Sequence, residues 1–159
     1  MKSMTSPWLD FFRGASTDSA GRSLHEILAW SDAELEAVHD YIQWLFPLPE
    51  RSMFNASAPI LTPADRAAVR ADATIQANIR AAFQRMLRFY GLTPDTAHLP
   101  KPWVCAADHN HLRLTRILRS LRLLGFPEES QTLYDGISQY NSVIPERTSQ
   151  FWRNAMTQD

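Results

Sequence analysis

Prolines and helix-capping residues divide this 159-residue chain into short segments, and these segments carry apolar residues at helical spacing. The chain has ten prolines but only five glycines. Pro63 follows Thr62, a good N-cap, while Pro127 and Pro145 stand where later helices are expected to begin. Proline is tolerated in the first turn of a helix and interrupts a helix elsewhere. No segment alternates apolar and polar residues for long enough to predict a sheet, so we expect an all-α fold.

Apolar periodicity and capping patterns together predict a single domain over residues 1–159, an irregular bundle of about six or seven helices. Ser31 is followed three residues later by Glu34, which is the spacing of a capping box. The helix that begins there is expected to bury Leu35, Val38, Ile42 and Leu45. The expected helices span residues 7–13, 23–30, 31–46, 62–90 with a break near Asp72, 107–124, 127–140 and 145–156.

The composition argues against several functional classes. Sixteen basic and seventeen acidic residues leave a net charge of -1, which provides no overall field for nucleic acid or a membrane surface. No uninterrupted apolar run is long enough to predict a membrane span. No glycine-rich phosphate-binding motif is present, and we expect no cofactor. The only cysteine, Cys105, cannot form an intramolecular disulfide, which fits a soluble cytoplasmic protein.

Residues 39–48 (HDYIQWLFPL), here called the signature segment, are the most unusual stretch of the chain. As part of a helix, the segment would place the rings of Tyr41 and Trp44 outside the inner apolar stripe. A helix that is apolar all round is either buried in the middle of a fold or part of an interface. One interpretation is therefore a central core helix. The other is an aromatic-lined groove for a peptide or partner helix, with His39 and Gln43 as its polar contacts.

Four arginines occupy the helix expected over residues 107–124, and they are Arg113, Arg116, Arg119 and Arg122. They spread over the side opposite the apolar stripe of Leu114, Ile117, Leu118 and Leu121. A basic helix face can follow the phosphates of a nucleic acid, so nucleic-acid binding is an alternative function. Solvation of the helix, or pairing within the chain, is favoured because no aromatic residues for base stacking are interleaved. The acids available for pairing are Asp32, Glu34, Glu36 and Asp40.

Three histidines and the cysteine fall close together in the sequence, and they are His98, Cys105, His109 and His111. Their spacing matches no standard zinc motif and includes no CxxC pair, so we expect no metal. A catalytic Cys105–His109 pair would need a thiol that is activated at a helix N-terminus. An enzyme that uses Cys105 or the cluster of His109 and His111 is thus a second alternative. A packed cysteine is the simpler explanation.

Several strings of the sequence carry a family resemblance. The longest are the signature segment and the string HNHLRLTRILRSL at residues 109–121. The shorter ones are GRSL at 21–24, LT at 61–62, FYG at 89–91 and the NxxIP-like turn at 141–145. Together they resemble the opioid growth factor receptor conserved region, over residues 8–156. We expect a microbial homologue of that region.

The resemblance implies a fold and a general role. In animals, a member of the family is a receptor for the opioid growth factor, a pentapeptide, and is found at or in the nucleus. That ligand and that location are not carried over to this chain, and the family offers no catalytic residues. We expect a non-enzymatic binding module for an unknown peptide or protein, with no prediction of its oligomeric state. The expected ligand-binding residues are His39, Tyr41, Gln43, Trp44, His109, Asn110 and Arg113.

Overall fold

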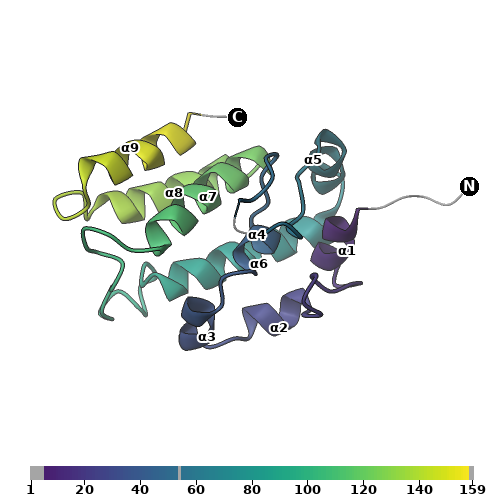
Figure 1. The fold of residues 1–159 in the computed structure, drawn as a ribbon, viewed down its shortest axis with the longest axis horizontal. Coiled ribbons are helices and arrows are strands. Elements are labelled where there is room, and N and C mark those ends of the chain that lie inside the picture. The colour runs from purple at the N-terminus through teal and green to yellow at the C-terminus, as the bar shows by residue number, and fades with distance from the viewer. Residues whose placement is uncertain (1–5, 54, 158–159) are drawn as a thin grey trace, which may run out of the picture. The chain divides into compact units, whose positions relative to one another are not determined.

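The computed structural model describes residues 6–53 and 55–157, and these residues form nine helices (Figure 1). The only β-type pairing among them is a single parallel bridge between Leu48 and Ile60. The expected all-α class is therefore confirmed. None of the helices in this described part is long and apolar enough to cross a membrane.

The chain divides into two compact units, and the boundary follows Arg85, inside α6 (Ala73–Phe89). Unit 1 comprises the chain up to Arg85, and unit 2 begins at Met86. Each unit is described by itself below. One domain over residues 1–159 stays a prediction.

Unit 1 holds five helices before α6, and most begin at the capping residues visible in the sequence. They are α1 (Pro7–Arg13), α2 (Leu24–Leu28), α3 (Asp32–Ala37), α4 (Ile42–Leu45) and α5 (Pro63–Arg70). The hydroxyl of Ser23 accepts a hydrogen bond from the main-chain N–H of Glu26, and Ser31 forms the expected capping box with Glu34. The large side chains of its core include Trp8, Phe11, Phe12, Leu24, Ile27, Leu35, Leu45 and Phe46.

The prediction of one continuous helix over residues 31–46 is wrong, because the chain leaves the helical conformation at Val38. The backbone of Val38 is extended, with φ -95° and ψ 133°, and α4 begins only at Ile42. Tyr41 explains part of the break, since its hydroxyl donates a 2.7 Å hydrogen bond to the main-chain carbonyl of Leu35. Leu35, Ile42 and Leu45 are buried, but they are not one stripe of one helix.

The break expected near Asp72 is confirmed, and Asp72 itself explains it. Its carboxylate accepts a 3.1 Å hydrogen bond from the main-chain N–H of Ile75, at the start of α6, and a 2.9 Å bond from Nε of Arg13. The carboxylate thus satisfies one of the free donors at the helix N-terminus. Because the chain leaves the helical conformation at Val38 and at Asp72, two of the seven predicted segments each contain two helices. This gives the nine helices of the described residues.

In unit 2, α7 (Asn110–Leu123) packs against both α8 (Pro127–Ser138) and α9 (Glu146–Ala155), and Figure 1 shows the three side by side. Gly125 has φ +93° and lets the chain turn after α7, as its place after the apolar stripe suggests. The predicted stripe of Leu114, Ile117, Leu118 and Leu121 is fully buried. Helix α7 is therefore the central helix of this unit.

Candidate functional site

The signature segment is packed into unit 1, and all residues from 41 to 47 are buried. Its α4 has only four residues and no side-chain N-cap. Two contacts anchor it to α1. The indole Nε1 of Trp8 donates a 2.8 Å hydrogen bond to the main-chain carbonyl of Trp44, and the rings of Phe11 and Trp44 meet edge to face with centroids 5.3 Å apart. The burial matches the core interpretation of the segment.

The polar side chains of the signature segment lie in different surroundings. His39 is exposed, whereas only 6% of Gln43 and 5% of Trp44 are exposed. Among the described residues, no hydrogen-bond partner lies near Oε1 of Gln43 or Nε1 of Trp44, although both atoms are buried. An external ligand can therefore touch His39 directly, but it would reach Gln43 and Trp44 only through a change in the packing.

Arg22 links the loop before α2 to Asp40 of the signature segment, and the sequence interpretation missed this residue. Its guanidinium lies 2.7 Å from the buried carboxylate of Asp18 and 2.9 Å from that of Asp40, and it covers the ring of Trp30 at 5.2 Å. Burial alone would lower the pKa of Arg22, but the hydrogen bonds from Arg22 to Asp18 and Asp40 outweigh it and raise the pKa. The ring of Trp30 in turn meets that of Tyr41 at 5.5 Å. Both residues lie in the loop between α1 and α2, where sequence spacing does not predict which side chains meet.

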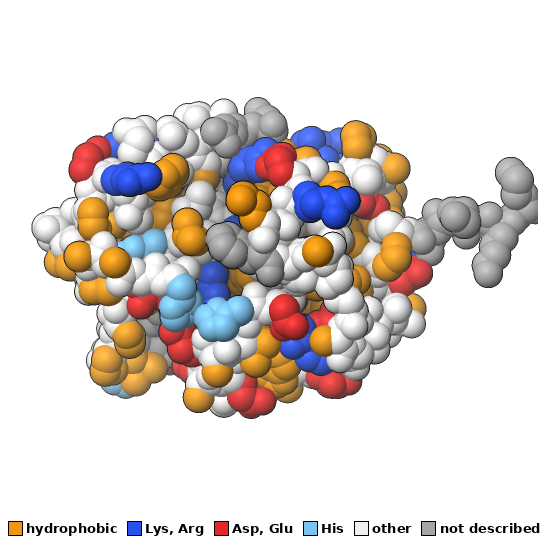
Figure 2. Space-filling model, viewed as in Figure 1, with side chains coloured by type: hydrophobic (Ala, Val, Ile, Leu, Met, Phe, Trp, Pro, Cys, Tyr) orange, Lys and Arg blue, Asp and Glu red, His pale blue; other side chains and the backbone are white. Residues whose placement is uncertain are grey.

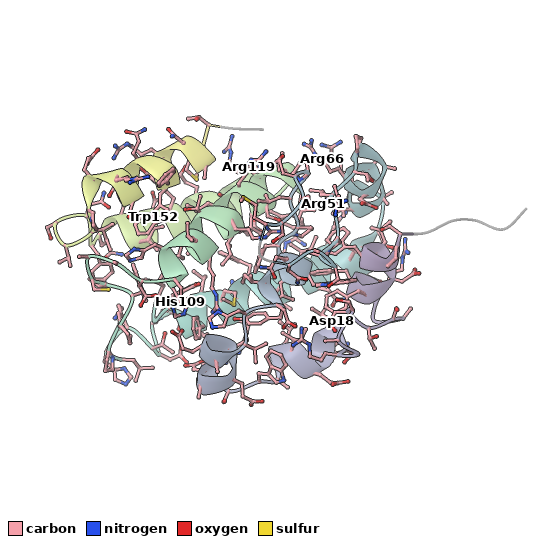
Figure 3. All side chains as sticks on the ribbon, in the orientation of Figure 1. Asp18, Arg51, Arg66, His109, Arg119 and Trp152 are labelled. Atoms are coloured by element: carbon pink, nitrogen blue, oxygen red, sulfur yellow. The ribbon has the colours of Figure 1, made fainter. Side chains whose placement is uncertain are left out.

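The remaining candidate residues lie at the start of α7, where the carboxylate of Asp108 already binds a main-chain N–H group. Oδ1 of Asp108 accepts a 2.8 Å hydrogen bond from the main-chain N–H of Asn110. His109 makes no side-chain cap and is exposed (Figure 3). Asn110 is buried, and its Oδ1 accepts from the hydroxyl of Tyr90 at 3.3 Å and from Nη1 of Arg113 at 3.4 Å. A ligand carboxylate at this helix end would have to compete with Asp108.

His111 lies in an aromatic cluster of unit 2, and it does not gather with the other potential metal ligands. Its Nε2 donates a 2.7 Å hydrogen bond to the carbonyl of Trp103, because a carbonyl oxygen can only accept. Trp152 of α9, labelled in Figure 3, donates to the carbonyl of His111 at 3.2 Å and meets its ring edge to face. His98 is exposed, and Sγ of Cys105 contacts the carbonyl of Ala107 at 3.3 Å. These contacts engage His111 and Cys105 separately.

The four arginines of α7 do not form a solvated face, which corrects that part of the prediction. Arg113 is only 6% exposed, and the other three are half-buried. Two of the acids expected as partners pair elsewhere, since Asp32 lies 2.7 Å from Arg85 and Asp40 pairs with Arg22. On the face that Figure 2 shows, basic side chains stand among acidic and apolar ones and do not merge into a basic surface.

The seven predicted site residues fall into two groups. His39, Tyr41, Gln43 and Trp44 belong to unit 1, and His109, Asn110 and Arg113 belong to unit 2. Within these groups, the structure brings Asn110 and Arg113 into direct contact. Their role in ligand binding stays a prediction.

The described residues define an all-α protein with short, aromatic-rich segments. A sequence model of the family described as "Opioid growth factor receptor (OGFr) conserved region" matches residues 8–138. The chain therefore belongs to the opioid growth factor receptor conserved-region family. The match ends before α9, whereas the resemblance seen in the sequence extended to residue 156.

Curated relatives are also similar to part of the chain. The opioid growth factor receptor of Mus musculus is 36% identical over 104 residues, which cover 57% of this chain and 16% of the relative. The human receptor is 36% identical over 112 residues, 60% of this chain and 16% of the relative. The opioid growth factor receptor-like protein 1 of Xenopus tropicalis is 34% identical over 119 residues, 67% of this chain and 23% of the relative. No solved structure matches the chain.

Proposed function

We propose that this chain is a non-enzymatic binding module for a peptide or protein ligand. Membership of the opioid growth factor receptor family carries the proposal, because two relatives that match part of the chain are named opioid growth factor receptor. The matched region spans only 16 to 23% of the length of these three relatives. The opioid growth factor is therefore a probe for this chain and not its assigned ligand.

Exposure divides the seven predicted residues into two roles. His39 and His109 are exposed and are the ones that a ligand contacts directly in this proposal. In this proposal the buried residues keep their segments folded and do not touch the ligand. They are Tyr41, Gln43, Trp44, Asn110 and Arg113.

The surroundings of Cys105 support a role without catalysis. A cysteine nucleophile needs a nearby base or cation that stabilises its thiolate. Sγ of Cys105 instead lies 3.3 Å from the main-chain carbonyl of Ala107, which is neither a base of useful strength nor a cation. The free thiol also fits a cytoplasmic location, which is part of the proposal.

Nuclear magnetic resonance titration of the ¹⁵N-labelled chain tests the binding proposal. The probes are the opioid growth factor pentapeptide and pools of peptides with varied sequence. We expect saturable shifts of amide resonances around His39 or His109, weakened at least about tenfold by His39→Ala or His109→Ala. His25→Ala is the matched control, since His25 is an exposed histidine of α2 outside the site. The proposal is refuted if none of the peptides produces saturable shifts.

Titration of the same protein with mixed DNA and RNA distinguishes the nucleic-acid alternative from the peptide proposal. Binding through the α7 arginines would be steeply weakened by salt and lost in Arg116→Ala and Arg119→Ala. We expect no submicromolar binding of mixed DNA or RNA at physiological salt, because these side chains are half-buried. Tight, salt-dependent binding that both substitutions abolish would favour the alternative over the peptide proposal.

A further inference from the structure

Met156 differs from the other methionines that the structure describes, because it is both within reach of solvent and in contact with a buried side chain. The structure describes three of the five methionines of the chain. Met53 is 95% exposed, so little packing depends on its side chain. Met86 is 1% exposed, so a solute does not reach its sulfur in the folded protein. Met156 is half-buried.

The contact of Met156 lies where the three helices of unit 2 meet. Its Sδ atom is 3.4 Å from the hydroxyl oxygen of Ser130 in α8. That hydroxyl is fully buried and donates a 2.8 Å hydrogen bond to the main-chain carbonyl of Leu118 in α7. A serine hydroxyl has one proton, and the shorter bond to the carbonyl oxygen uses it. The sulfur tolerates this arrangement, because a thioether is only a weak acceptor.

Met156 also continues the buried face of α9, of which it is the C-cap residue. Ser149 and Trp152 lie seven and four residues before it, a spacing that places all three on one side of a helix. Trp152 is 1% exposed, and its Nε1 donates a 3.2 Å hydrogen bond to the carbonyl of His111 in α7. A change at Met156 therefore acts on the end of the helix that attaches Trp152 to α7.

We propose that Met156 is a redox-sensitive modification site, and that its oxidation to the sulfoxide by hydrogen peroxide loosens α9 from α7 and α8. The sulfur attacks one oxygen of the peroxide, so an S–O bond forms and the O–O bond breaks. The other oxygen leaves as hydroxide and takes the proton of the transferred oxygen, which gives water. The sulfur is oxidised by two electrons and the peroxide is reduced. The inference does not depend on the proposed binding function.

The loosening follows from the polarity of the product. A sulfoxide oxygen is a polar acceptor on a side chain that was apolar before oxidation. Ser130 can donate to it only by giving up the hydrogen bond to Leu118, and a buried acceptor without a donor costs free energy. Water is the other source of donors, and Met156 is close enough to the surface to reach it. We therefore expect the oxidised side chain to leave Ser130 and turn outward.

Hydrogen exchange at the indole Nε1 of Trp152, in the ¹⁵N-labelled, full-length chain, measures the attachment of α9. Hydrogen peroxide is the probe, and mass spectrometry of peptides records which methionines gain one oxygen atom. We expect Met53 to react first and Met156 next. Oxidation of Met156 should raise the exchange rate at Trp152 at least about tenfold, and a methionine sulfoxide reductase should reverse the effect. Nε1 of Trp8, which donates to a carbonyl in unit 1, is the internal control and should not change.

Substitutions separate Met156 from the other oxidisable groups. Met156→Leu keeps an apolar side chain and should abolish the effect of peroxide, whereas Met53→Leu is the matched control and should retain it. Both variants contain Cys105, so an effect of thiol oxidation would survive in Met156→Leu. Met156→Gln, which imitates the polarity of the sulfoxide, should raise the exchange rate at Trp152 without peroxide.

Three outcomes would overturn the proposal. One is that Met156 stays unoxidised under conditions that convert Met53. Another is that its oxidation, recorded by mass, leaves the exchange rate at Trp152 unchanged or raises the rate at Trp8 by the same factor. The third is an equal response to peroxide in Met156→Leu.

Discussion

The indole of Trp8 donates a 2.8 Å hydrogen bond to the main-chain carbonyl of Trp44, which joins α1 to the signature segment. This bond satisfies a carbonyl near the end of a helix of only four residues, where intrahelical partners run out. The edge-to-face contact of Phe11 with Trp44 reinforces the same junction. The signature segment is thus held by residues of α1 that lie more than 30 positions earlier, and not by a long helix of its own.

Replacement of Trp44 by alanine is the direct test of this packing. Because only 5% of Trp44 is exposed, we expect Trp44→Ala to lower the free energy of unfolding by about 3–5 kcal/mol. The measurement is urea unfolding followed by circular dichroism. Phe151→Ala, at an exposed ring on α9, is the control and should cost much less. A Trp44→Ala protein of nearly wild-type stability would show that the ring faces an open groove.

Arg22 is expected to be as important for unit 1 as any apolar residue. Arg22→Met would leave the carboxylate of Asp18 buried and without its cation, and breaking a buried ion pair from one side costs about 3–5 kcal/mol. Arg153→Met removes the cation from an ion pair with Glu146 that lies on the surface, and it should cost less than about 1 kcal/mol. Chemical unfolding of the two variants compares them. Equal, small losses would mean that Asp18 is adequately solvated without Arg22.

The helix starts were predictable because their causes are local. Ser23, Ser31, Thr62 and Asp72 each accept a hydrogen bond from a main-chain N–H three residues later, so the cap and its partner lie within one short window of sequence. The proline before a helix acts on the same local scale. Positions of this kind were found without knowledge of the fold.

The break at Val38 was not predictable in the same way. The apolar spacing around it suits a helix, and periodicity contains no information about the contacts that stop it. Asp40 is held by Arg22, which lies far back in the sequence, and Tyr41 uses its hydroxyl on the carbonyl of Leu35. Tertiary contacts therefore overrode the local pattern.

The candidate site shows the same limit. The sequence identified His109 and Asn110 as polar residues at a helix start, and both lie there, His109 as the N-cap residue of α7 and Asn110 as its first residue. Sequence alone could not show that Asn110 is buried against Tyr90 and Arg113, or that Asp108 caps the helix. Burial depends on which segments meet, and the spacing of residues along one helix does not determine this.

Asp72 makes stability depend on acidic pH in a predictable direction. The hydrogen bond from the N–H of Ile75, and then the one from Arg13, lower the pKa of the Asp72 carboxyl. A lowered pKa in the folded state means that the charged form stabilises the fold. This stabilisation is present above the ordinary carboxyl pKa of about 4 and is lost as the pH falls through the lower folded value.

Asp72→Asn tests this pH dependence, because asparagine keeps the capping oxygen but cannot ionise. Its melting temperature should lie below that of the wild type at neutral pH, and the difference should shrink as the pH falls below about 4. Asp135→Asn, at an exposed position on α8, serves as the control and should show a smaller difference. A difference in melting temperature that is constant from neutral to acidic pH would contradict the role of the charge.

Gly91 and Gly125 have similar backbone conformations but different surroundings. Substitution of each by alanine therefore tests whether backbone conformation or contacts of the new side chain determine the loss of stability. Gly91 has φ +72° and Gly125 has φ +93°, both in the left-handed region that disfavours side chains. A Cβ at Gly91 would lie 3.2 Å from Cε of Lys101 and 3.4 Å from the carbonyl oxygen of Thr96. A Cβ at Gly125 would meet nothing within 4 Å. Any difference between the two substitutions therefore comes from the contacts of the new methyl group.

We expect Gly125→Ala to cost about 1 kcal/mol, which is the conformational penalty alone, and Gly91→Ala to cost about 2 kcal/mol because the side chain of Lys101 must also move. Gly125→Asn should cost less than Gly125→Ala, since asparagine tolerates the left-handed conformation. Urea unfolding of all three variants provides the comparison. If Gly91→Ala were no more costly than Gly125→Ala, the flexible side chain of Lys101 would be giving way freely, and the turn after α6 would be less tightly packed than its distances indicate.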